Sequence, residues 1–276
     1  AYVRLYANGE LVGQSVVTAG GNWEITSEPL VDDVYLFTVE LEDLAGNVSE
    51  TASQPLIIAE DYGFYLDPIT HMVIFHGENN VADVVTVSVD GGTDLLIEWA
   101  QPGLGISGSA RFPLATTPSF TFLGYGGDDL LVVDNSGGLV ALPDGIIYDG
   151  GEGNDLLLLL GGTAVGSGTY NVGPQPGQGS VIHVLGSATQ TVRFTNLEPV
   201  LDLVAGPLTV NGTSASNYFG YDVGPNSGEA IAGGQTTAVV TVDNFEWIEF
   251  SNKPSLTING LGGNDTINLN NAPNPA

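Results

Sequence analysis

Cysteine is absent from this 276-residue sequence, and basic residues and long apolar runs are scarce. Without cysteine the chain has no disulfides, no thiol chemistry and no cysteine-based zinc sites, so its core, its backbone ladders or metal ions must hold it together. No apolar run reaches the length of about 18 residues that suggests a membrane-spanning helix, so membrane insertion is not expected. A signal peptide and an initiator methionine are also missing, which predicts a piece of a longer precursor.

Basic residues number only four, Arg4, Arg111, Arg193 and Lys253, against 32 acidic residues. The formal charge of −28 excludes a general affinity for nucleic acid or for anionic membranes, because the basic surface that such partners need is missing. The acidic residues either form a solvating coat or include cation ligands.

The sequence has the pattern of an all-β protein. Glycine is abundant, with 39 residues, and short alternating runs such as "VTVSV" and "TTAVVTV" lie between glycine, asparagine and proline. Such alternation is typical of half-buried strands, and the bounding residues are typical of turns.

Residues 1–58 are predicted to form a small β-sandwich. "YVRLYANGELVGQSVVTA" indicates two strands joined at Asn8-Gly9, a strong hairpin signal, and turns recur about every 10 residues. This segment resembles bacterial Ig-like domains of large surface proteins in "VRLYANGELVG", in "GNW" at 21–23 and in "DLAGNVS" at 43–49. The resemblance implies an immunoglobulin-like sandwich truncated by one strand before Tyr2. Either this piece leaves that strand out, or a neighbouring chain supplies it by strand addition.

Internal repeats follow a predicted linker at 59–64. Residues 196–219 align without gaps on residues 244–267, at an offset of 48. A strand-turn-strand signature also begins near residues 73, 120 and 146. The turn glycines of these segments are separated by 47, 26, 62 and 48 residues; they are Gly77, Gly124, Gly150, Gly212 and Gly260. These separations predict a unit of about 24–26 residues, sometimes doubled, with an insertion inside the interval of 62.

Residues 65–271 are therefore predicted to form a parallel β-helix (β-solenoid), followed by a tail at 272–276. A run of sandwiches built from hairpins is the alternative. The five leucines Leu156–Leu160 fit a solenoid strand in which three side chains face inward and two face outward. The outward pair is expected either to lie under the Gly/Pro-rich segment 161–180 or to form a contact surface.

The turns carry the candidate metal ligands. "GGEGNDLL" at 150–157 resembles the calcium-binding repeats of RTX proteins, and "GYGGDDLL" at 124–131 and "GLGGNDTI" at 260–267 lack only the second glycine. The resemblance implies Ca²⁺ held by backbone carbonyls and aspartates. RTX motifs recur every nine residues, which does not happen here, but rungs of 26 residues would stack equivalent turns on each other. The predicted ligands are Asp128, Asp129, Asn154 and Asp155, with Asp265 as a poorer candidate. Ordinary turn chemistry without an ion is the alternative.

Other chemistry is less well supported by the sequence. His71, His76 and His183 have no metal-binding spacing and are expected at the surface or in turns. Many parallel β-helices are polysaccharide lyases or hydrolases, but the basic residues are far apart here and turn chemistry already accounts for the aspartates. We therefore predict no enzyme. Trp99 and Tyr125 are the aromatic residues that could contact a glycan.

These observations predict a non-enzymatic structural or adhesive segment of a large secreted or cell-surface bacterial protein, such as a stalk, matrix, surface-layer or filament component. Calcium would stiffen it, and its partners would be further copies, neighbouring domains of the same protein or a polysaccharide. The alternatives are a carbohydrate-binding module and a β-helix enzyme that degrades polysaccharides.

Overall fold

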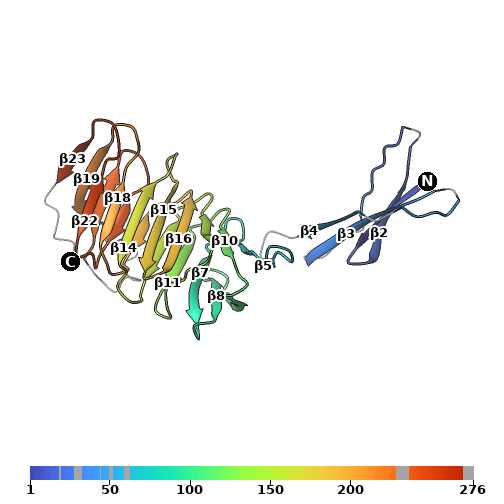
Figure 1. Cartoon of the computed structure of the whole chain (residues 1–276), viewed down its shortest axis with the longest axis horizontal. Coiled ribbons are helices and arrows are strands. Elements are labelled where there is room, and N and C mark those ends of the chain that lie inside the picture. The colour runs from blue at the N-terminus through green and yellow to red at the C-terminus, as the bar shows by residue number, and fades with distance from the viewer. Residues whose placement is uncertain are drawn as a thin grey trace. The chain divides into compact units, whose positions relative to one another are not determined.

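The computed structural model describes residues 1–18, 20–27, 33–43, 45–49, 52–58, 63–227 and 236–269. These residues form strands and turns and contain no helix, which confirms the all-β prediction. The chain divides into two compact units, residues 1–70 and 71–276 (Figure 1). The predicted tail and residues 59–62 of the predicted linker lie outside the described residues.

The first unit contains one antiparallel sheet with the order β2-β1-β3-β4. Its strands are β1 (Tyr2–Ala7), β2 (Glu10–Val16), β3 (Asp33–Glu42) and β4 (Ala52–Ile58), and β5 (Gly63–Leu66) follows them in sequence. The predicted hairpin is confirmed: Ala7 pairs with Glu10 across Asn8 and Gly9, which both have the positive φ of a two-residue hairpin turn. Because β1 pairs with both β2 and β3, the edges of this sheet are β2 and β4.

The second unit contains two sheets between which the chain alternates. The β10 sheet has the order β22-β18-β14-β15-β16-β12-β10-β6, and the β11 sheet has the order β23-β19-β20-β21-β17-β13-β11-β7-β8-β9. The strands of the β10 sheet are β6 (Val73–His76), β10 (Ser119–Leu123), β12 (Gly145–Asp149), β14 (Ser167–Val172), β15 (Gly179–Leu185), β16 (Ala188–Thr195), β18 (Leu208–Asn211) and β22 (Leu256–Asn259). Those of the β11 sheet are β7 (Val84–Asp90), β8 (Asp94–Gln101), β9 (Ile106–Pro113), β11 (Leu130–Asp134), β13 (Leu156–Leu160), β17 (Val200–Asp202), β19 (Tyr218–Val223), β20 (Ala238–Val242), β21 (Ile248–Phe250) and β23 (Thr266–Leu269).

The offsets between the sequence repeats correspond to the register in which parallel strands pair. The offset of 48 pairs β17 with β21, β18 with β22 and β19 with β23, so residues that align in sequence lie side by side. The offset of 26 pairs β10 with β12 and β11 with β13. Equivalent residues of successive repeats therefore stack on one another in both sheets, as the gap-free alignment predicted.

Antiparallel strands interrupt the parallel order, and here the structure differs from a continuous parallel β-helix. The hairpin β8–β9 extends one end of the β11 sheet. Three antiparallel strands, β14–β15–β16, form the insertion predicted within the interval of 62, and three more, β19–β20–β21, lie within a repeat of 48. The prediction of doubled units was therefore wrong, because the long repeats contain inserted strands. Segment 161–180 was also misassigned, since it supplies strands to the β10 sheet.

The leucine run serves two separate apolar layers. Leu157 and Leu159 are fully buried and lie in register with Leu131 and Val133 of β11. On β17 their partners are Val200 and the buried Asp202. Leu158 belongs to a second cluster with Val132 and Leu201, against which Leu156 and Leu160 pack. The sequence prediction had this division reversed: two leucines face the other sheet and three face away from it.

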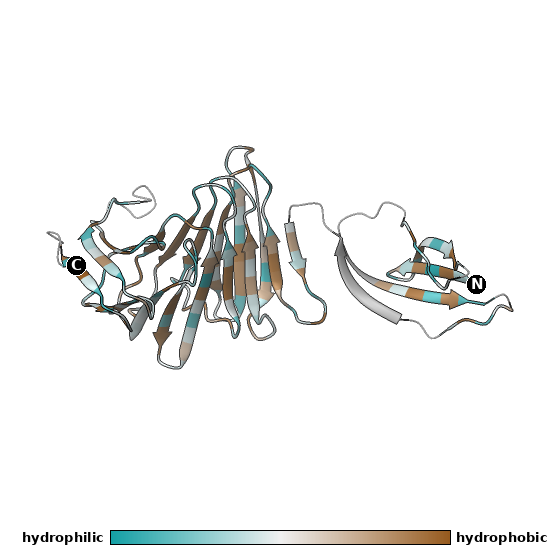
Figure 2. Ribbon diagram, turned by 90° about the horizontal axis from the view of Figure 1, so that it is seen from above, coloured by the Kyte–Doolittle hydropathy of each residue, from teal (hydrophilic) through white to brown (hydrophobic). Residues whose placement is uncertain are grey.

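Aromatic side chains line the β10 sheet between the layers. Phe75, Phe122 and Tyr148 lie in register and are fully buried. Tyr148 stacks on Phe122 with ring centroids 4.9 Å apart, and Phe75 lies tilted against Phe122 at 5.7 Å. Hydrophobic residues are concentrated on the strands of this unit (Figure 2). The core therefore lies between the two sheets and extends along the whole stack.

Candidate functional site

Each glycine-acid turn links a strand of the β10 sheet to a strand of the β11 sheet. Gly77, Gly124 and Gly150 stack on one another, because a side chain added to Gly77 or Gly124 would meet the carbonyl oxygen of the next glycine. The added side chain would also collide with the carboxylate five or six residues later, that of Asp83, Asp129 or Asp155 respectively. Glycine is thus required because the acid of the same turn folds back over its Cα atom.

The acids of successive turns form a hydrogen-bonded ladder. The backbone N–H of Asp83 donates to Oδ1 of Asp129 at 2.7 Å, and the N–H of Asp129 donates to Oδ1 of Asp155 at 2.8 Å. The same bond recurs at the far end of the stack, where the N–H of Asn217 donates to Oδ1 of Asp265 at 2.9 Å. Asp129, Asp155 and Asp265 therefore each tie their own turn to the backbone of the preceding one, whereas Asp83 accepts the N–H of Glu78 within its own turn at 2.9 Å. We call Asp83, Asp129 and Asp155 the carboxylate ladder.

The carboxylate ladder is almost fully buried, with exposures of 0%, 1% and 0% for its three residues. Each side chain has one buried oxygen without a hydrogen-bond partner among the described residues. Burial raises the pKa of Asp129 to about 7 and that of Asp155 to about 6, and neighbouring carboxylates add to both shifts. Burial also raises the pKa of Asp83. Three acids in one column thus repel one another when ionised.

The predicted calcium ligands divide between the two sides of these turns. Asp128 and Asn154 are exposed and hydrogen-bond to each other, whereas Asp129 and Asp155 are buried. Asp265 is exposed at the far end of the stack. No group of three or more His, Asp or Glu residues within the described ranges has the arrangement of a metal site. The unpartnered buried oxygens of Asp129 and Asp155 are the observation that favours a cation, and calcium stays a prediction.

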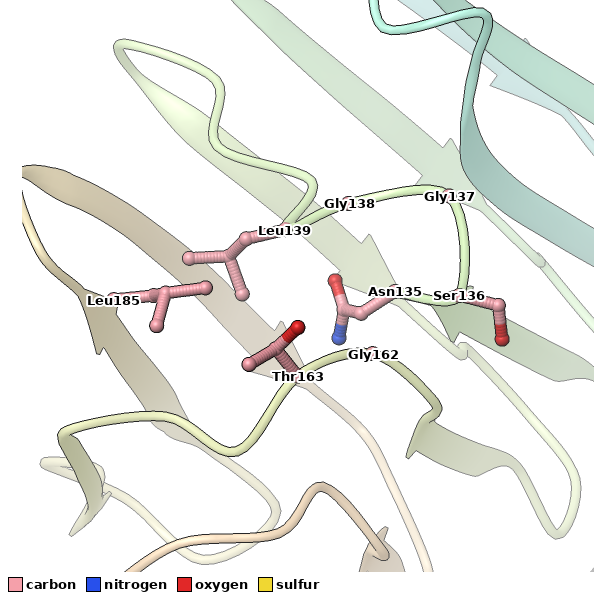
Figure 3. Close-up of a pocket in the computed structure, with 8 residues that line it drawn as sticks. All are labelled: Asn135, Ser136, Gly137, Gly138, Leu139, Gly162, Thr163 and Leu185. Carbon is pink, nitrogen blue, oxygen red and sulfur yellow. The ribbon is translucent and has the colours of Figure 1, made fainter.

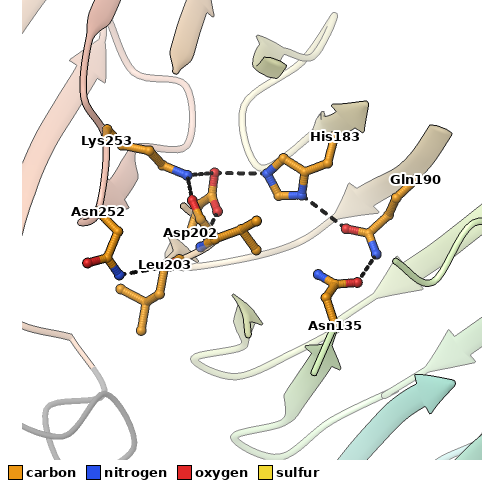
Figure 4. Close-up of polar contacts among 8 residues, drawn as sticks. Asn135, His183, Gln190, Asp202, Leu203, Asn252 and Lys253 are labelled. Carbon is orange, nitrogen blue, oxygen red and sulfur yellow. Dashed lines mark hydrogen bonds and ion pairs between the residues drawn. The ribbon is translucent and has the colours of Figure 1, made fainter. Parts of the chain in front are cut away.

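A second polar group lies between the two sheets, where sequence reasoning placed nothing (Figure 4). Lys253 Nζ lies 2.8 Å from Asp202 Oδ2, and His183 Nε2 lies 3.1 Å from the same oxygen. Gln190 contacts His183 Nδ1 at 3.0 Å and donates to Asn135 Oδ1 at 2.7 Å. All five residues are buried. We call Lys253, Asp202 and His183 the interior triad.

The interior triad corrects the prediction for His183, which is 0% exposed and not at the surface. Burial by itself would raise the pKa of the Asp202 carboxyl, but Lys253 and His183 outweigh it and hold that pKa below its ordinary value. The signal for this site is weak in the sequence: His183 and Asp202 occupy inward positions of the apolar strands "VIHVL" and "VLDLV". Polar residues at inward positions need partners from elsewhere in the chain, which a single sequence does not reveal.

Of the remaining histidines, His71 matches its prediction and His76 is only partly buried. His71 is exposed in a turn with φ of 58°. His76 ends β6, and its Nδ1 lies 2.5 Å from the hydroxyl of Tyr125.

A hollow of about 440 Å³ lies beside Asn135, between the loops that follow β11 and β13 (Figure 3). It is lined by Asn135, Ser136, Gly137, Gly138, Leu139, Gly162, Thr163 and Leu185. Asn135 Oδ1 accepts from the N–H of Val140 and from Gln190, while its amide nitrogen has no partner among the described residues. The hollow contains no charged side chain, so it offers hydrogen bonds but no acid or base.

The predicted glycan contacts do not form one platform. Trp99 is half-buried and stacks on the inward-facing ring of Phe75, 6.1 Å away. Tyr125 is 39% exposed and stacks on His76, the next residue of β6. Neighbouring strand residues point to opposite faces of a sheet, so the two aromatic residues serve different faces.

Comparison with known proteins gives one finding. Residues 1–59 match the family model of a bacterial Ig-like domain, which supports the Ig-like interpretation of the first unit. No curated protein and no solved structure matches the chain. The likeness of the later turns to RTX repeats stays a prediction. Within the described residues, no helix is long and apolar enough to cross a membrane. The first 59 residues of the chain are thus similar to bacterial Ig-like domains.

Proposed function

We propose that this chain is a non-enzymatic structural or adhesive segment of a large secreted or cell-surface bacterial protein. In this proposal the second unit acts as a stiff β-solenoid-like spacer and the Ig-like unit connects it to the rest of the protein. The observation that carries the proposal is the carboxylate ladder. The carboxylates of Asp129 and Asp155 accept hydrogen bonds from the backbone of the preceding turn and are shielded from solvent, so we assign them the role of joining rungs.

The last rung favours self-association. Ile267 and Leu269 of β23 are 49% and 68% exposed, and together with Leu256, Ile258 and Tyr221 they surround an apolar hollow. Among the described residues, β22 and β23 each pair on one side only. A row of free backbone groups beside an apolar face is suited to pairing with another copy of the chain. Analytical ultracentrifugation would show association that Leu269→Glu abolishes, while a fully monomeric parent chain contradicts this part of the proposal.

Resistance to unfolding under load tests the scaffold function. The second unit, pulled between its ends in single-molecule force spectroscopy, is expected to resist as one cooperative body. An Asp129→Ala chain, which loses the bond to the N–H of Asp83, should yield at lower force. Thr116→Ala, whose hydroxyl bonds only locally at the surface, is the matched control. Equal forces for all three chains would contradict the structural role of the ladder.

Calcium is the second part of the proposal, supported by the unpartnered oxygens of Asp129 and Asp155. Calcium prefers six to eight oxygen ligands, and the turn carbonyls would have to supply most of them. Melting with calcium and with a chelator tests it: a higher melting temperature in calcium, lost in Asp155→Asn, supports the site. An unchanged melting temperature removes the metal and leaves the scaffold proposal intact.

Glycan binding is the second candidate function, supported by the exposed ring of Tyr125 and by a hollow of about 450 Å³ beside Trp99. Retention on a glycan array that Tyr125→Ala or Trp99→Ala removes would favour it over the scaffold. Depolymerisation of an acidic polysaccharide, abolished by Asp155→Asn, would favour an enzyme instead.

A further inference from the structure

The one lysine of the chain lies in its interior. Lys253 is 0% exposed, as are Asp202 and His183, and no other charged side chain among the described residues hydrogen-bonds to these three. Lysine is rarely fully buried, because removing an ammonium from water is costly. The burial of this lysine places its amine next to an acid, Asp202, and the imidazole of His183, which can carry a proton, contacts the same acid.

The hydrogen bonds around His183 assign its protons. Gln190 uses its amide nitrogen to donate to Asn135 Oδ1 and to the carbonyl of Val140, so its oxygen faces His183 Nδ1, which must carry hydrogen. The 3.1 Å contact between His183 Nε2 and Asp202 Oδ2 then needs one further proton. That proton makes the His183–Asp202 pair neutral in total, whichever of the two residues holds it.

In its ion pair with Asp202, Lys253 is an ammonium, and it becomes a nucleophile only as the uncharged amine; the charge count shows how this buried site favours that reactive form. An ammonium would give the interior triad a net charge of +1 in a buried site, whereas an uncharged amine gives a net charge of zero. A neutral amine can donate to Asp202 Oδ2 and to the carbonyl of Val204, which are its two acceptors in the structure. Its lone pair then remains for attack on a carbon atom.

From this geometry we propose that Lys253 and Asp202 condense to an intramolecular amide, a covalent cross-link between β17 and the segment after β21. Nζ attacks Cγ of Asp202, and the new negative charge develops on Oδ1, which already accepts the N–H of Val204 at 3.1 Å. The Cγ–Oδ2 bond breaks. Oδ2 leaves as water with one proton from Nζ and one from the imidazolium of His183. Fixed proximity of buried groups supplies the effective concentration that such a condensation lacks in solution.

The cross-link would join residues 51 positions apart in sequence, and it stands independently of the scaffold proposal. It has one competing interpretation, a buried ion pair that stays unreacted. The two differ by one water molecule, so the intact mass of the purified chain separates them. We expect a mass lower than the sequence mass by one water. A folded chain that keeps the full mass after prolonged incubation overturns the proposal.

The site of the cross-link can be mapped with a protease that cuts after glutamate. Cleavage after Glu152, Glu229 and Glu249 separates residues 153–229, which contain Asp202, from residues 250–276, which contain Lys253, because the bond between Glu198 and Pro199 resists such a protease. The two peptides are expected to stay joined and to fragment as a branched pair. Two separate peptides of unmodified mass overturn the proposal.

Variants separate chemistry from folding. Lys253→Met keeps the apolar stem and is expected to have the full mass of its own sequence. His183→Gln keeps a side-chain amide near Asp202 but cannot transfer a proton, so condensation should slow about a hundredfold while circular dichroism stays unchanged. A water-loss rate in His183→Gln equal to that of the parent removes His183 as the proton carrier.

The matched control is an exposed pair. Arg111 contacts Asp90 at 2.8 Å, and the two side chains are 56% and 45% exposed. Arg111→Lys puts a lysine beside a carboxylate in water, and this chain should lose only the one water assigned to Lys253. Loss of a second water would show that contact alone suffices, which contradicts the argument from burial.

Discussion

The second unit contains buried carboxylates in two places, and it treats them in opposite ways. In the carboxylate ladder, acids of like charge lie in one column, and Asp129 and Asp155 accept hydrogen bonds from backbone N–H groups. In the interior triad, one acid lies between a lysine and a histidine. Burial acts on both sites, but the neighbours decide the result: the pKa of Asp129 rises to about 7, whereas that of Asp202 falls.

The two sites change the stability of the fold with pH in opposite directions. A raised folded-state pKa contributes stability that is present below the ordinary value of 3.8 and is lost as the pH rises through about 6 for Asp155 and about 7 for Asp129. A lowered pKa contributes stability that is present above 3.8 and is lost as the pH falls below it, which applies to Asp202 in a chain without the cross-link. The protein should therefore be most stable in mildly acidic solution.

The largest expected effect comes from the interior triad. Lys253→Met removes the partner of Asp202, whether the two residues are cross-linked or form an ion pair, and should lower the free energy of unfolding by about 3–5 kcal/mol, because it leaves a carboxylate buried beside His183 alone. Urea unfolding followed by tryptophan fluorescence measures the loss. The double change Lys253→Met with Asp202→Leu leaves no unpaired buried carboxylate and should recover much of the loss. A single variant as stable as the parent would contradict the importance of the triad.

A smaller effect is expected where the ladder meets the glycines. Gly150→Ala pushes a methyl group into the carbonyl oxygen of Asn196 and the side chain of Asp155, which should cost about 2–3 kcal/mol of overpacking strain. Thermal melting measures it. Gly103→Ala is the control, because nothing lies within 4 Å of the added atom. Equal losses from the two changes would mean that the turns do not stack as described.

The smallest expected effect concerns charge within the ladder. Asp129→Asn keeps an oxygen for the N–H of Asp83 but removes repulsion from Asp155, Asp83 and Asp128. At pH 8 it should raise the free energy of unfolding by about 2 kcal/mol, and at pH 4 it should change little. Stability curves at the two pH values measure the difference. Destabilisation at pH 8 would show that the ionised ladder is bound to a cation.

The register of the second unit was readable from the sequence, whereas its insertions were only partly so. Identical residues such as Thr209 and Thr257 lie side by side because parallel stacking puts equal positions in equal surroundings. A hairpin insertion changes the repeat length without marking where the chain reverses, so β8–β9 and β19–β20–β21 were counted as additional rungs. The leucine run had no alternation to fix its faces, and its division was therefore reversed.

The candidate sites differ in the same way. The acid turns repeat, so Asp129 and Asp155 were singled out correctly as equivalent neighbours, although what they bind was not evident from the pattern. Lys253, Asp202 and His183 are spread over 71 positions and come together only through strand order. One sequence shows each of them as an isolated polar residue among apolar neighbours.

The two three-stranded insertions have a consequence for how such a protein can change its length. The strands β14–β15–β16 add to one sheet, and β19–β20–β21 add the same number to the other, so the layers finish level at β22 and β23. Deleting either insertion alone would leave one sheet with fewer strands than the other. The apolar face of the longer sheet would then be exposed to solvent. Insertions and deletions of strands are therefore expected in pairs, one in each sheet. The length of such a protein would then change in fixed steps.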